Sequence, residues 1–472
     1  MGSASNAHYN RNNSPSEEVA LVSSDGYKKI DSLTLFIPSN LDMDKMLELY
    51  PPNFRYQRDC FIYVIHEVIA VAVRNRDKVE DMSGFTPIKR EYLQRRIHGY
   101  KKYVNYLVER KVLEQNNIYV PGKQSMGLRL SSKYRGGIVR PIQITKWTLI
   151  KNIVYLNINY NEGLTNELII LKKWFNPNLT IDAKNGLRFL KKEYRKDVRN
   201  PEVKFPHLRL TSRSQALQKL HQGEITFIVD NSGQRLHTNL TPLMSGLRKF
   251  VKYDSENLCA IDIKNSQPYL STSLLSRESF LKNNMTDKII NPYYINQDNY
   301  PIMIVDFIDE IENKPDVLQF KEMVSSGLFY EKFGSALIKK ELINKDSLDI
   351  RKQAKDITFR SIFSPNTSVS YSESIKLFKE AFPNVYKIFK MIKKGRGNHN
   401  TLAIALQRLE ANLVLKKTCM IVSKEKPEAP LFTIHDSIVT TPGNVEYVEK
   451  ILYNILNDNI GLPPNLKREY WV

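Results

Sequence analysis

The sequence predicts an α+β fold with more than one domain, and three observations carry this prediction. The chain has 472 residues, and at roughly 100–200 residues per domain this length suggests two to four domains. Its N-terminal half contains stretches with apolar residues at helical spacing, such as 60–73 and 101–113. Its C-terminal half contains short β-type runs that end in single acids, at Asp262 and Asp436.

The composition excludes several classes of protein. With 42% apolar and 25% charged residues, the chain is neither a disordered polyampholyte nor a membrane protein. No run approaches the ~20 apolar residues that span a bilayer, so we expect no membrane partner. The first residues lack the apolar segment of a secretory signal. Three cysteines, far apart in sequence, exclude a disulfide framework and a Cys-built zinc site, and they suit a reducing cytoplasm.

The net charge indicates the kind of partner. The chain holds 70 Lys and Arg against 50 Asp and Glu, a formal charge of +20. Such a surplus points to a polyanion, most simply nucleic acid; the alternative is a basic protein without such a partner. Residues 86–150 carry 14 Lys or Arg and 3 acids, so +11 of the surplus lies in this segment.

The same part of the chain predicts a separate basic module over residues 51–145, which follows a flexible N-terminal tail over 1–50. Three helices, over 60–73, 88–97 and 101–113, precede two β-like runs around a Pro-Gly turn within 118–130. This order resembles a winged helix-turn-helix, whose third helix commonly docks in a DNA groove. Winged helices also bind proteins, so the predicted partner of the module is either duplex DNA or a protein.

Two acids of the C-terminal half stand in segments with a distinctive pattern. In Leu258–Leu270, an apolar run ends in Asp262 and a polar turn follows. In Leu431–Thr441, His435 and Asp436 interrupt two β-type runs, as the tip of a hairpin does. Carboxylates at the ends of two neighbouring strands could hold a pair of Mg²⁺ ions. Such ions, about 3.5–4 Å apart, would activate a hydroxyl nucleophile and stabilise a leaving pyrophosphate. The alternative is that both are ordinary strand-end or turn acids.

A third segment suits a nucleotide. Arg351, Lys355, Phe359 and Phe363 recur every four residues, so they form one stripe along a helix. Two cations can meet a triphosphate, and an aromatic ring can stack on the base. A solvated basic helix is the alternative interpretation.

These three segments, in this order, resemble the palm and fingers of family A DNA polymerases. Segments 233–243, 378–385 and 405–412 are similar to further motifs of the family, so the resemblance covers residues from about 230 to 472. It implies a right-hand polymerase, with an antiparallel sheet in the palm and helical fingers and thumb. The implied division is a thumb-like or connecting region over 146–224, palm over 225–280 and 401–472, and fingers over 281–400.

The resemblance also implies roles for single residues. Asp262 and Asp436, with the Ile263 carbonyl, would bind two Mg²⁺ ions, with Mn²⁺ as a substitute. Arg351 and Lys355 would bind the triphosphate, and Lys355 would protonate the leaving pyrophosphate; both are implied nucleotide-binding residues with Phe359, which would stack on the base, Phe363 and Gln267. The implied primer and template contacts are Arg235, Asn239, Arg248, Gln407 and His435. The partners would be a DNA primer–template and dNTPs.

Three positions depart from the family's DNA polymerases. Gln267 stands where they have the Glu that blocks a ribose 2′-hydroxyl, and Gln is nearly isosteric, so a steric gate could survive. Phe363 stands where Tyr is usual, and Ser437 follows His-Asp as in single-subunit phage-type RNA polymerases. NTPs therefore stay open as substrates.

The function predicted from the sequence is that of a compact DNA-dependent DNA polymerase encoded by a phage or a mobile element. We expect no proofreading, because the acids before residue 225 form no exonuclease-like cluster; Glu109 and Glu114 belong to a helix and Asp25 to the tail. Three alternatives remain: a single-subunit RNA polymerase or primase on the same fold, template-independent nucleotide addition, and a DNA-binding replication initiator with a relic polymerase domain.

Overall fold

The protein is described by a computed structural model, which covers residues 21–23, 26–28, 32–74, 79, 82–116, 127–158, 166–289, 300–339, 343, 349–394 and 398–472. The chain forms two compact units. The first unit contains residues 1–159 and 194–215, and the second contains 160–193 and 216–472. The division falls within helix α9 (Ala183–Arg199) and within helix α10 (Pro206–His221).

The first unit combines helices with small antiparallel sheets. Strand β1 pairs with β2, β3 pairs with β7, and β4, β6 and β5 form a three-stranded sheet with β6 in the middle. Its elements are β1 (Leu21–Ser23), β2 (Gly26–Lys28), β3 (Leu33–Pro38), α1 (Met43–Leu49), α2 (Arg58–Arg74), β4 (Thr86–Pro87), α4 (Arg90–Arg96), α5 (Tyr100–Glu109), β5 (Leu113–Gln115), β6 (Gly127–Leu130), α6 (Ser132–Arg135), β7 (Val139–Ile144) and α7 (Trp147–Ile158).

Helix α2 is the centre of this unit's core. Its apolar residues are nearly all buried, and Phe61 packs its ring against Tyr103 and Tyr106 of α5, with centroids 4.7 and 5.0 Å apart. At its start, the Asp59 carboxylate accepts hydrogen bonds from the backbone N–H groups of Thr145 and Lys146, both at 2.8 Å. These bonds tie the chain that follows β7 to the first turn of α2.

The third predicted helix is shorter than the sequence pattern indicated. Helix α5 ends at Glu109 rather than at Leu113, and Lys111 adopts a left-handed backbone with φ of 53°. Leu113, which is 1% exposed, starts strand β5 instead. The last apolar residue of the pattern therefore belongs to a strand. Of the predicted hairpin, β6 is present, whereas the Pro-Gly turn lies outside the described residues.

The second unit contains a four-stranded antiparallel sheet in the order β14–β15–β13–β16, with a β8–β11–β12 sheet and a β9–β10 pair. Its elements besides the start of α9 and the end of α10 are α8 (Asn166–Lys172), β8 (Leu179–Ile181), β9 (Phe227–Val229), β10 (Leu236–Thr238), α11 (Ser245–Arg248), β11 (Val251–Tyr253), β12 (Glu256–Asn257), β13 (Cys259–Ile263), α12 (Ser266–Ser271), α13 (Arg277–Lys282), α14 (Met285–Ile289), α15 (Tyr300–Ile311), α16 (Pro315–Ser325), α17 (Phe329–Lys339), α18 (Ile350–Phe363), α19 (Glu373–Ala381), α20 (Pro383–Ile392), α21 (Thr401–Ala411), α22 (Met420–Glu425), β14 (Phe432–Ile434), β15 (Ser437–Thr440), α23 (Val445–Ile460) and β16 (Leu466–Tyr470).

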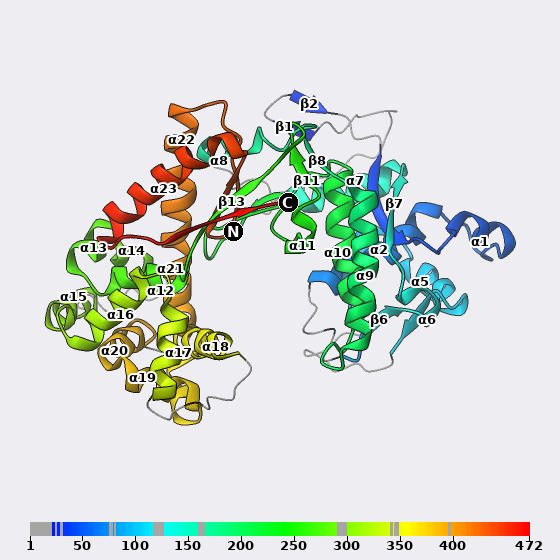
Figure 1. Cartoon of the computed structure of the whole chain (residues 1–472). Helices are drawn as coiled ribbons and strands as arrows, with labels where there is room; N and C mark the ends of the chain where they lie inside the picture. Colours follow the sequence, from blue (N-terminus) through cyan, green and yellow to red (C-terminus); the bar gives the residue numbers. More distant parts are fainter. Residues whose placement is uncertain are drawn as a thin grey trace, which may run out of the picture. The chain divides into compact units, whose positions relative to one another are not determined.

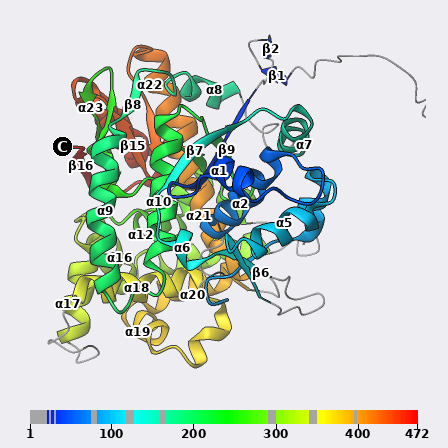
Figure 2. The same ribbon diagram turned by 90° about the vertical axis from the view of Figure 1, so that its right-hand side faces the viewer.

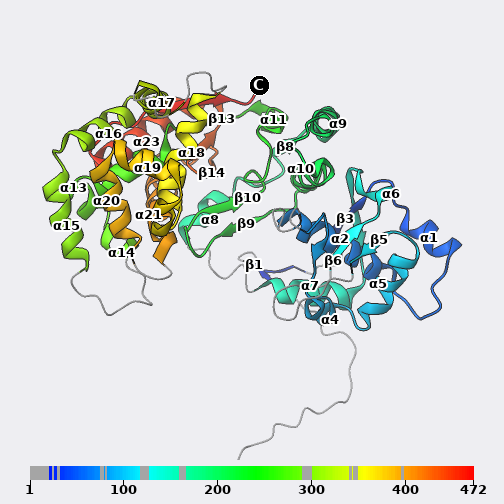
Figure 3. The ribbon, with the colours of Figure 1, turned by 90° about the horizontal axis from the view of Figure 1, so that it is seen from below.

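Helices α15 to α20 gather at one end of the second unit and the four-stranded sheet lies at the other (Figures 1 and 2). Their core is aromatic: Phe320 of α16 packs edge-on against Phe329 of α17, Phe378 of α19 and the buried Phe382. Helix α18 packs against α17 on one side and α19 on another (Figure 3). The aromatic core thus supports the helix that carries the Arg-Lys-Phe stripe.

A π-helix over Asn412–Cys419 joins α21 to α22 without a break. The Thr418 hydroxyl donates to the carbonyl of Leu413, five residues earlier, at 2.8 Å. Such wide turns occur often at functional sites.

The predicted α+β class is confirmed by this mixture of helices and small antiparallel sheets. Among the helices of the described residues, none has both the length and the apolar character that a bilayer span requires. The six segments predicted from the sequence divide the chain more finely than these two units, and their boundaries stay predictions.

Candidate active site

The four-stranded sheet brings the two acids of the sequence motifs together. Strand β13 lies between β15 and β16, so Asp262 is directly opposite Ser437 on one side and Lys467 on the other. Strands β14 and β15 form the predicted hairpin, and His435 turns the chain with a left-handed φ of 54°. Asp436 follows in this tight turn, next to the strand that carries Asp262.

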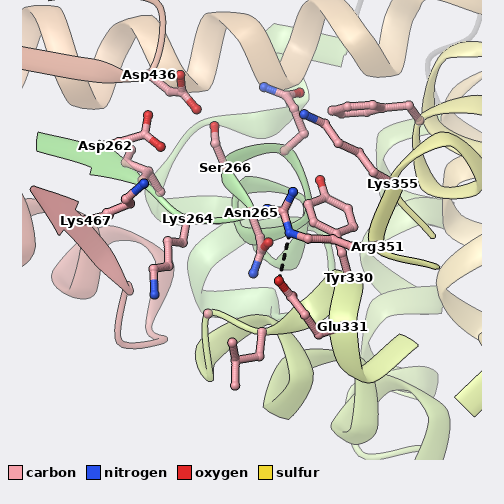
Figure 4. Close-up of a pocket in the computed structure, with 15 residues that line it drawn as sticks. Asp262, Lys264, Asn265, Ser266, Tyr330, Glu331, Arg351, Lys355, Asp436 and Lys467 are labelled. Atoms are coloured by element: carbon pink, nitrogen blue, oxygen red, sulfur yellow. Dashed lines mark hydrogen bonds and ion pairs between the residues drawn. The ribbon is translucent and has the colours of Figure 1, made fainter. Parts of the chain in front are cut away.

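Both acids line a pocket of about 410 Å³ (Figure 4). Helix α18 lines the pocket with Arg351, Lys355 and Phe359, so the strand ends and the basic stripe share one cavity. The lining residues among those described are Asp262, Ile263, Lys264, Asn265, Ser266, Gln267, Gly327, Leu328, Tyr330, Glu331, Arg351, Lys355, Phe359, Asp436 and Lys467.

The pocket environment disfavours the charged form of both acids. Burial raises the pKa of Asp262, the neighbouring Asp436 carboxylate raises it further, and a hydrogen bond of 2.7 Å from the Ser437 hydroxyl opposes these effects. Burial also raises the pKa of Asp436, whereas the Ser266 hydroxyl, which points toward it in Figure 4, opposes the rise. Two carboxylates in one partly buried place favour an added cation.

The basic side of the pocket begins at a well-formed helix start. Asp349 caps α18 by accepting a hydrogen bond from the Lys352 backbone N–H at 2.8 Å. In the first turn of α18, Arg351 donates from Nε to the Glu331 carboxylate at 2.8 Å, and its guanidinium lies 5.6 Å from the Tyr330 ring centroid (Figure 4). In this state of the pocket, a carboxylate of α17 occupies part of the hydrogen-bonding capacity of Arg351.

The next two residues of the stripe on α18 are Lys355 and Phe359. The Lys355 ammonium lies 5.3 Å from the centroid of Phe359, and the exposed amine extends into the pocket. The ring of Phe363, one turn further along α18, lies 5.4 Å from that of Phe359. Three of the four stripe residues therefore line the pocket, and Phe363 packs behind them.

A buried acid of α21 connects several predicted residues. Glu410 accepts hydrogen bonds from Arg235 Nε at 2.8 Å and Nη2 at 2.7 Å, and from the Gln267 amide nitrogen at 2.9 Å. Its side chain is 1% exposed. Burial raises the pKa of Glu410 to about 7, and Arg235 opposes this rise.

The predicted primer and template residues occupy different surroundings. Arg235 is engaged by Glu410, and the His435 ring lies 6.2 Å from that of His237. Gln407 packs against Gly233, where an added Cβ would lie 2.6 Å from its Oε1 atom.

Asn239 and Arg248 make contacts with other parts of the chain. Asn239 is 4% exposed, and its amide bonds the backbone of Thr226 and Glu224 at 2.7 and 2.6 Å. Arg248 lies 5.7 Å from the Trp471 ring centroid. Among the described residues that line the pocket, none is one of the five predicted primer and template residues.

The sequence motifs missed several residues of the pocket. Lys264 and Lys467 add two cations beside Asp262, and α17 contributes Tyr330 and Glu331. Glu410 lies in the segment 405–412, whose resemblance to the family implies no role for it. One signal could have found it, because it is an acid within a helix whose neighbours at helical spacing, Leu406 and Leu413, are apolar.

Asp262 and Asp436 are the two acids that could hold a metal ion in the pocket. Among the described residues, no group of three or more His, Cys, Asp and Glu side chains could hold a metal ion. A pair of carboxylates suits Mg²⁺, which binds through one or two carboxylates and keeps waters or substrate phosphates as its other ligands.

Comparison with known proteins gives distant similarity to solved structures. No protein-family model matches the chain, and no curated protein matches it. Among solved structures, the chain is similar to the POL domain of Pol1 from M. smegmatis, determined in complex with a DNA primer-template and dNTP. The TM-score is 0.37 and the identity 9%, over 69% of this chain and 73% of that chain. A likeness this remote does not decide the function, which is inferred from the side chains of the pocket.

Proposed function

We propose that the protein is a template-directed nucleotidyltransferase, a DNA-dependent DNA polymerase that joins dNTPs to a primer 3′-hydroxyl. The observation that carries this proposal is the pocket itself. Two neighbouring carboxylates, Asp262 and Asp436, share it with Arg351, Lys355 and Phe359 of one helix. Carboxylates that attract cations, cations that attract phosphates and a ring that can stack on a base are the three groups that phosphoryl transfer from a nucleotide requires.

The roles follow from the chemistry of each side chain. Arg351 and Lys355 bind the triphosphate through charge-assisted hydrogen bonds. Phe359, which follows Lys355 by one helical turn, stacks on the incoming base, while Phe363 supports Phe359 from behind. Lys355 also gives a proton to the leaving pyrophosphate. Lys264 and Lys467, which line the pocket beside Asp262, add positive charge where the pyrophosphate departs.

The metal site of this proposal consists of Asp262 and Asp436 with the carbonyl of Ile263. The residues fit Mg²⁺, because the Asp436 carboxylate lies close enough to raise the pKa of Asp262, and the described residues that line the pocket include no Cys, His or Met. Bound divalent ions, Mg²⁺ or Mn²⁺, would lower the pKa of the primer hydroxyl and stabilise charge on the pyrophosphate. Ser437 orients Asp262 by its hydrogen bond to one carboxylate oxygen.

The primer and template side of the proposal uses Arg235, His435, Gln407, Arg248 and Asn239. His435 precedes Asp436 in the chain, and Arg235 lies close enough to oppose the rise in the pKa of Asp436, so both lie beside this acid. Gln407 and Arg248 extend the polar surface, and Asn239 fixes the backbone near Glu224. We expect no proofreading and a cytoplasmic setting in a bacterial or phage-infected cell. The right-hand division into palm, fingers and thumb belongs to this proposal too.

A primer-extension assay tests the proposal. Purified protein with Mg²⁺, a labelled primer, a DNA template and dNTPs should extend the primer in the order that the template specifies. Asp262→Asn and Asp436→Asn should each lower the rate about 100-fold or more, since loss of a group that only supports a metal ligand already costs about 10–100-fold. Asp316→Asn, which changes an acid of α16 that does not line the pocket, is the matched control.

Parallel arms separate the alternatives. Efficient extension with NTPs and none with dNTPs would favour an RNA polymerase or primase. Product of biased composition made without a template would favour template-independent addition. Unchanged biological activity of the double variant Asp262→Asn/Asp436→Asn would favour a DNA-binding initiator with a relic domain.

The first unit supports a second activity, contact with duplex DNA. Elements α2, β4, α4, α5, β5 and β6 follow one another in the order of a winged helix, with an antiparallel β4–β6–β5 sheet. Helix α5 buries Val104 and Leu107 and exposes Lys101, Lys102 and Asn105. We propose that this exposed face binds duplex DNA; a protein partner is the alternative.

A further inference from the structure

Five basic side chains come together where helices α13, α14 and α21 meet the π-helix. Helix α14 packs against α13 and α21, and α21 continues into the π-helix over Asn412–Cys419 (Figure 1). The five residues, here called the basic cluster, are Lys282, Lys288, Arg408, Lys416 and Lys417. None of them is among the described residues that line the pocket, so the basic cluster is separate from the candidate active site.

The charges of the basic cluster repel one another. Burial lowers the pKa of Lys288, and although the exposed Asp287 raises it, three other members of the cluster lie close enough to lower it further: Lys417, Lys416 and Arg408. Burial also lowers the pKa of Lys417, and the nearby Lys282 lowers it further. Among the described residues, no carboxylate forms an ion pair with any member of the cluster. The fold therefore brings positive charges together without an ion pair that neutralises them.

Two buried asparagines hold the half-buried lysines of the cluster in place. Asn283 and Asn459 are 2% and 5% exposed, and the Asn283 side-chain amide donates to the Asn459 backbone carbonyl at 2.7 Å. Lys288 donates from Nζ to the Asn283 backbone carbonyl, and Lys417 donates from Nζ to the Asn459 side-chain oxygen. These oxygens orient the two ammonium groups but carry no charge. Because an ammonium group has three donors, each lysine keeps donors that no described residue accepts.

This arrangement suits a ligand with several phosphate groups. Half-buried cations without an acid partner are costly to the folded chain, and an anion that meets them gains charge-assisted hydrogen bonds. A nucleic-acid strand carries one phosphate per nucleotide, so it can meet several members of the cluster at once. Because Lys288 and Lys417 are already held by the two asparagines, they lose little side-chain entropy when the ligand binds.

The position of Arg408 indicates which part of a nucleic acid lies nearby. Arg408 follows the predicted template residue Gln407 on α21, and its Nε donates to the Ser232 carbonyl at 2.8 Å. Gln407 itself packs against Gly233, the next residue. The basic cluster therefore begins beside a residue of the proposed template side, and it continues about 13 Å along the helix to Lys417.

We propose that the basic cluster binds the phosphate backbone of a single nucleic-acid strand, the uncopied part of a template. The choice of this strand rests on the proposed function, because a template is single-stranded where it has not yet been copied. A single strand can also bend to reach half-buried lysines, whereas a duplex is stiff over about 150 base pairs. The inference gives the π-helix a task, since it carries Lys416 and Lys417.

Binding of a single strand measures this contact without catalysis. Fluorescence anisotropy of a labelled oligo-dT, with the full chain and without nucleotide or divalent ion, compares wild type with Lys288→Gln/Lys417→Gln. We expect the Kd of the variant to rise about tenfold, the effect of losing one hydrogen bond between charged groups. Between about 50 and 200 mM salt, the slope of log K against log salt should flatten by about 0.7 for each phosphate contact that is lost.

Two further variants keep the test decisive if this double variant folds poorly. Lys282→Gln/Lys416→Gln changes only exposed members of the cluster, and the affinity should fall with the same flattening of the salt dependence. Asn459→Asp keeps all five cations and puts a carboxylate beside the Lys417 ammonium, so binding should weaken although no cation is lost. Thermal unfolding of each variant verifies that it is folded.

Two controls separate the basic cluster from net charge and from duplex binding. Lys379→Gln/Lys390→Gln removes the same charge from exposed positions of α19 and α20, and its Kd for the single strand should stay at the wild-type value. The same oligonucleotide annealed to its complement is the second control. Its affinity should change little in the cluster variants, because the proposed ligand is a single strand.

Three results would overturn the inference. One is unchanged single-strand affinity in the folded cluster variants, and another is an equal loss of affinity in the lysine control, which would show that only net charge matters. The third is an equal loss for the duplex. These results leave the proposed function standing. Conversely, a wild-type protein that binds the strand through the basic cluster but extends no primer would contradict the proposed function and support the binding surface.

Discussion

At the scale of single residues, the ion pair between Arg351 and Glu331 bears directly on nucleotide binding. Glu331 accepts from Arg351 Nε at 2.8 Å, and both side chains line the pocket. A triphosphate that binds Arg351 has to compete with this carboxylate. The pair is also partly exposed, so its own contribution to stability is small.

We therefore expect Glu331→Gln to bind the nucleotide more tightly. The variant removes the competing charge and keeps the shape of the side chain, so KM for the nucleotide should fall about threefold to tenfold at low salt while kcat changes little. Steady-state primer extension at two salt concentrations measures this. Lys332→Gln, at the next position of α17 and outside the pocket, is the control. A KM that rises in Glu331→Gln would show that the carboxylate orients Arg351 for binding.

Much of the candidate site could be predicted at this scale, because its residues stand in ordered motifs. Asp262, Asp436, Arg351, Lys355, Phe359 and Gln267 do line one pocket. The sequence could not reveal Tyr330 or Lys467, because a single Tyr or Lys carries no spacing signal. Their proximity results from the packing of α17 on α18 and from the pairing of β13 with β16.

At the scale of elements, helix α18 is fixed at its C-terminal end by a buried lysine. Lys393, which is 4% exposed, donates from Nζ to the carbonyl oxygens of Ser361 at 2.7 Å and Ser364 at 3.0 Å. These carbonyls belong to the last turn and the end of the helix, where partners are otherwise lacking. Burial lowers the pKa of Lys393 to about 8.

Lys393→Met should therefore destabilise the protein in a pH-dependent way. The variant leaves two carbonyls without a donor, at a cost of about 1–3 kcal/mol in the free energy of unfolding. Because folding lowers the pKa of this lysine from 10.5, the unfolded chain binds more protons between the two values, and the contribution of Lys393 to stability rises with pH across this window. Denaturant unfolding at pH 7.5, 9 and 10.5 measures the difference between wild type and variant. A difference that stays constant with pH would contradict the burial argument.

Elements were predicted well where one pattern decided them, and less well where two competed. The His435–Asp436 hairpin and the helix over 350–363 follow their patterns. The helix over 101–113 does not, because Leu113 continues its apolar spacing although it is buried in a strand that pairs with β6. Only the tertiary structure decides which element such residues join.

At the scale of the whole molecule, fewer cations are available to bind a partner than the net charge of +20 suggests. In the 86–150 segment, Arg129 and Arg135 share the Glu114 carboxylate, at 2.7 and 3.0 Å. Arg96 is 5% exposed. The cations available to a partner are therefore the exposed ones, such as Lys101 and Lys102 of α5.

We expect Lys101→Glu/Lys102→Glu to weaken the binding of duplex DNA. Loss of phosphate contacts should lower the affinity and also flatten its dependence on salt, since each contact contributes about −0.9 to the slope of log K against log salt. Fluorescence anisotropy with a labelled duplex from 50 to 200 mM salt, about the range over which such contacts weaken strongly, measures both quantities. The control is Lys379→Glu/Lys390→Glu, an equal change of charge on exposed residues of α19 and α20. An equal loss in both variants would mean that only net charge matters.

The division of the chain into units could not be predicted from composition. Residues 194–215 belong to the first compact unit although they follow a stretch that belongs to the second. Both borders fall inside helices, at 193/194 and 215/216, so no loop marks the change from one unit to the other. A domain that takes up a distant piece of chain leaves no local signal.

The π-helix over Asn412–Cys419 has a consequence for how the sequence can vary in length. Because a π-turn holds one more residue than an α-turn, it absorbs an extra residue without rotating the helix on either side. Deleting one residue here should close the turn into ordinary α-helix, with Glu410 and the buried Val422 keeping their faces. A deletion within α21 would instead turn all later side chains by about 100°. Length changes should therefore be tolerated at this one turn of the helix and rejected around it.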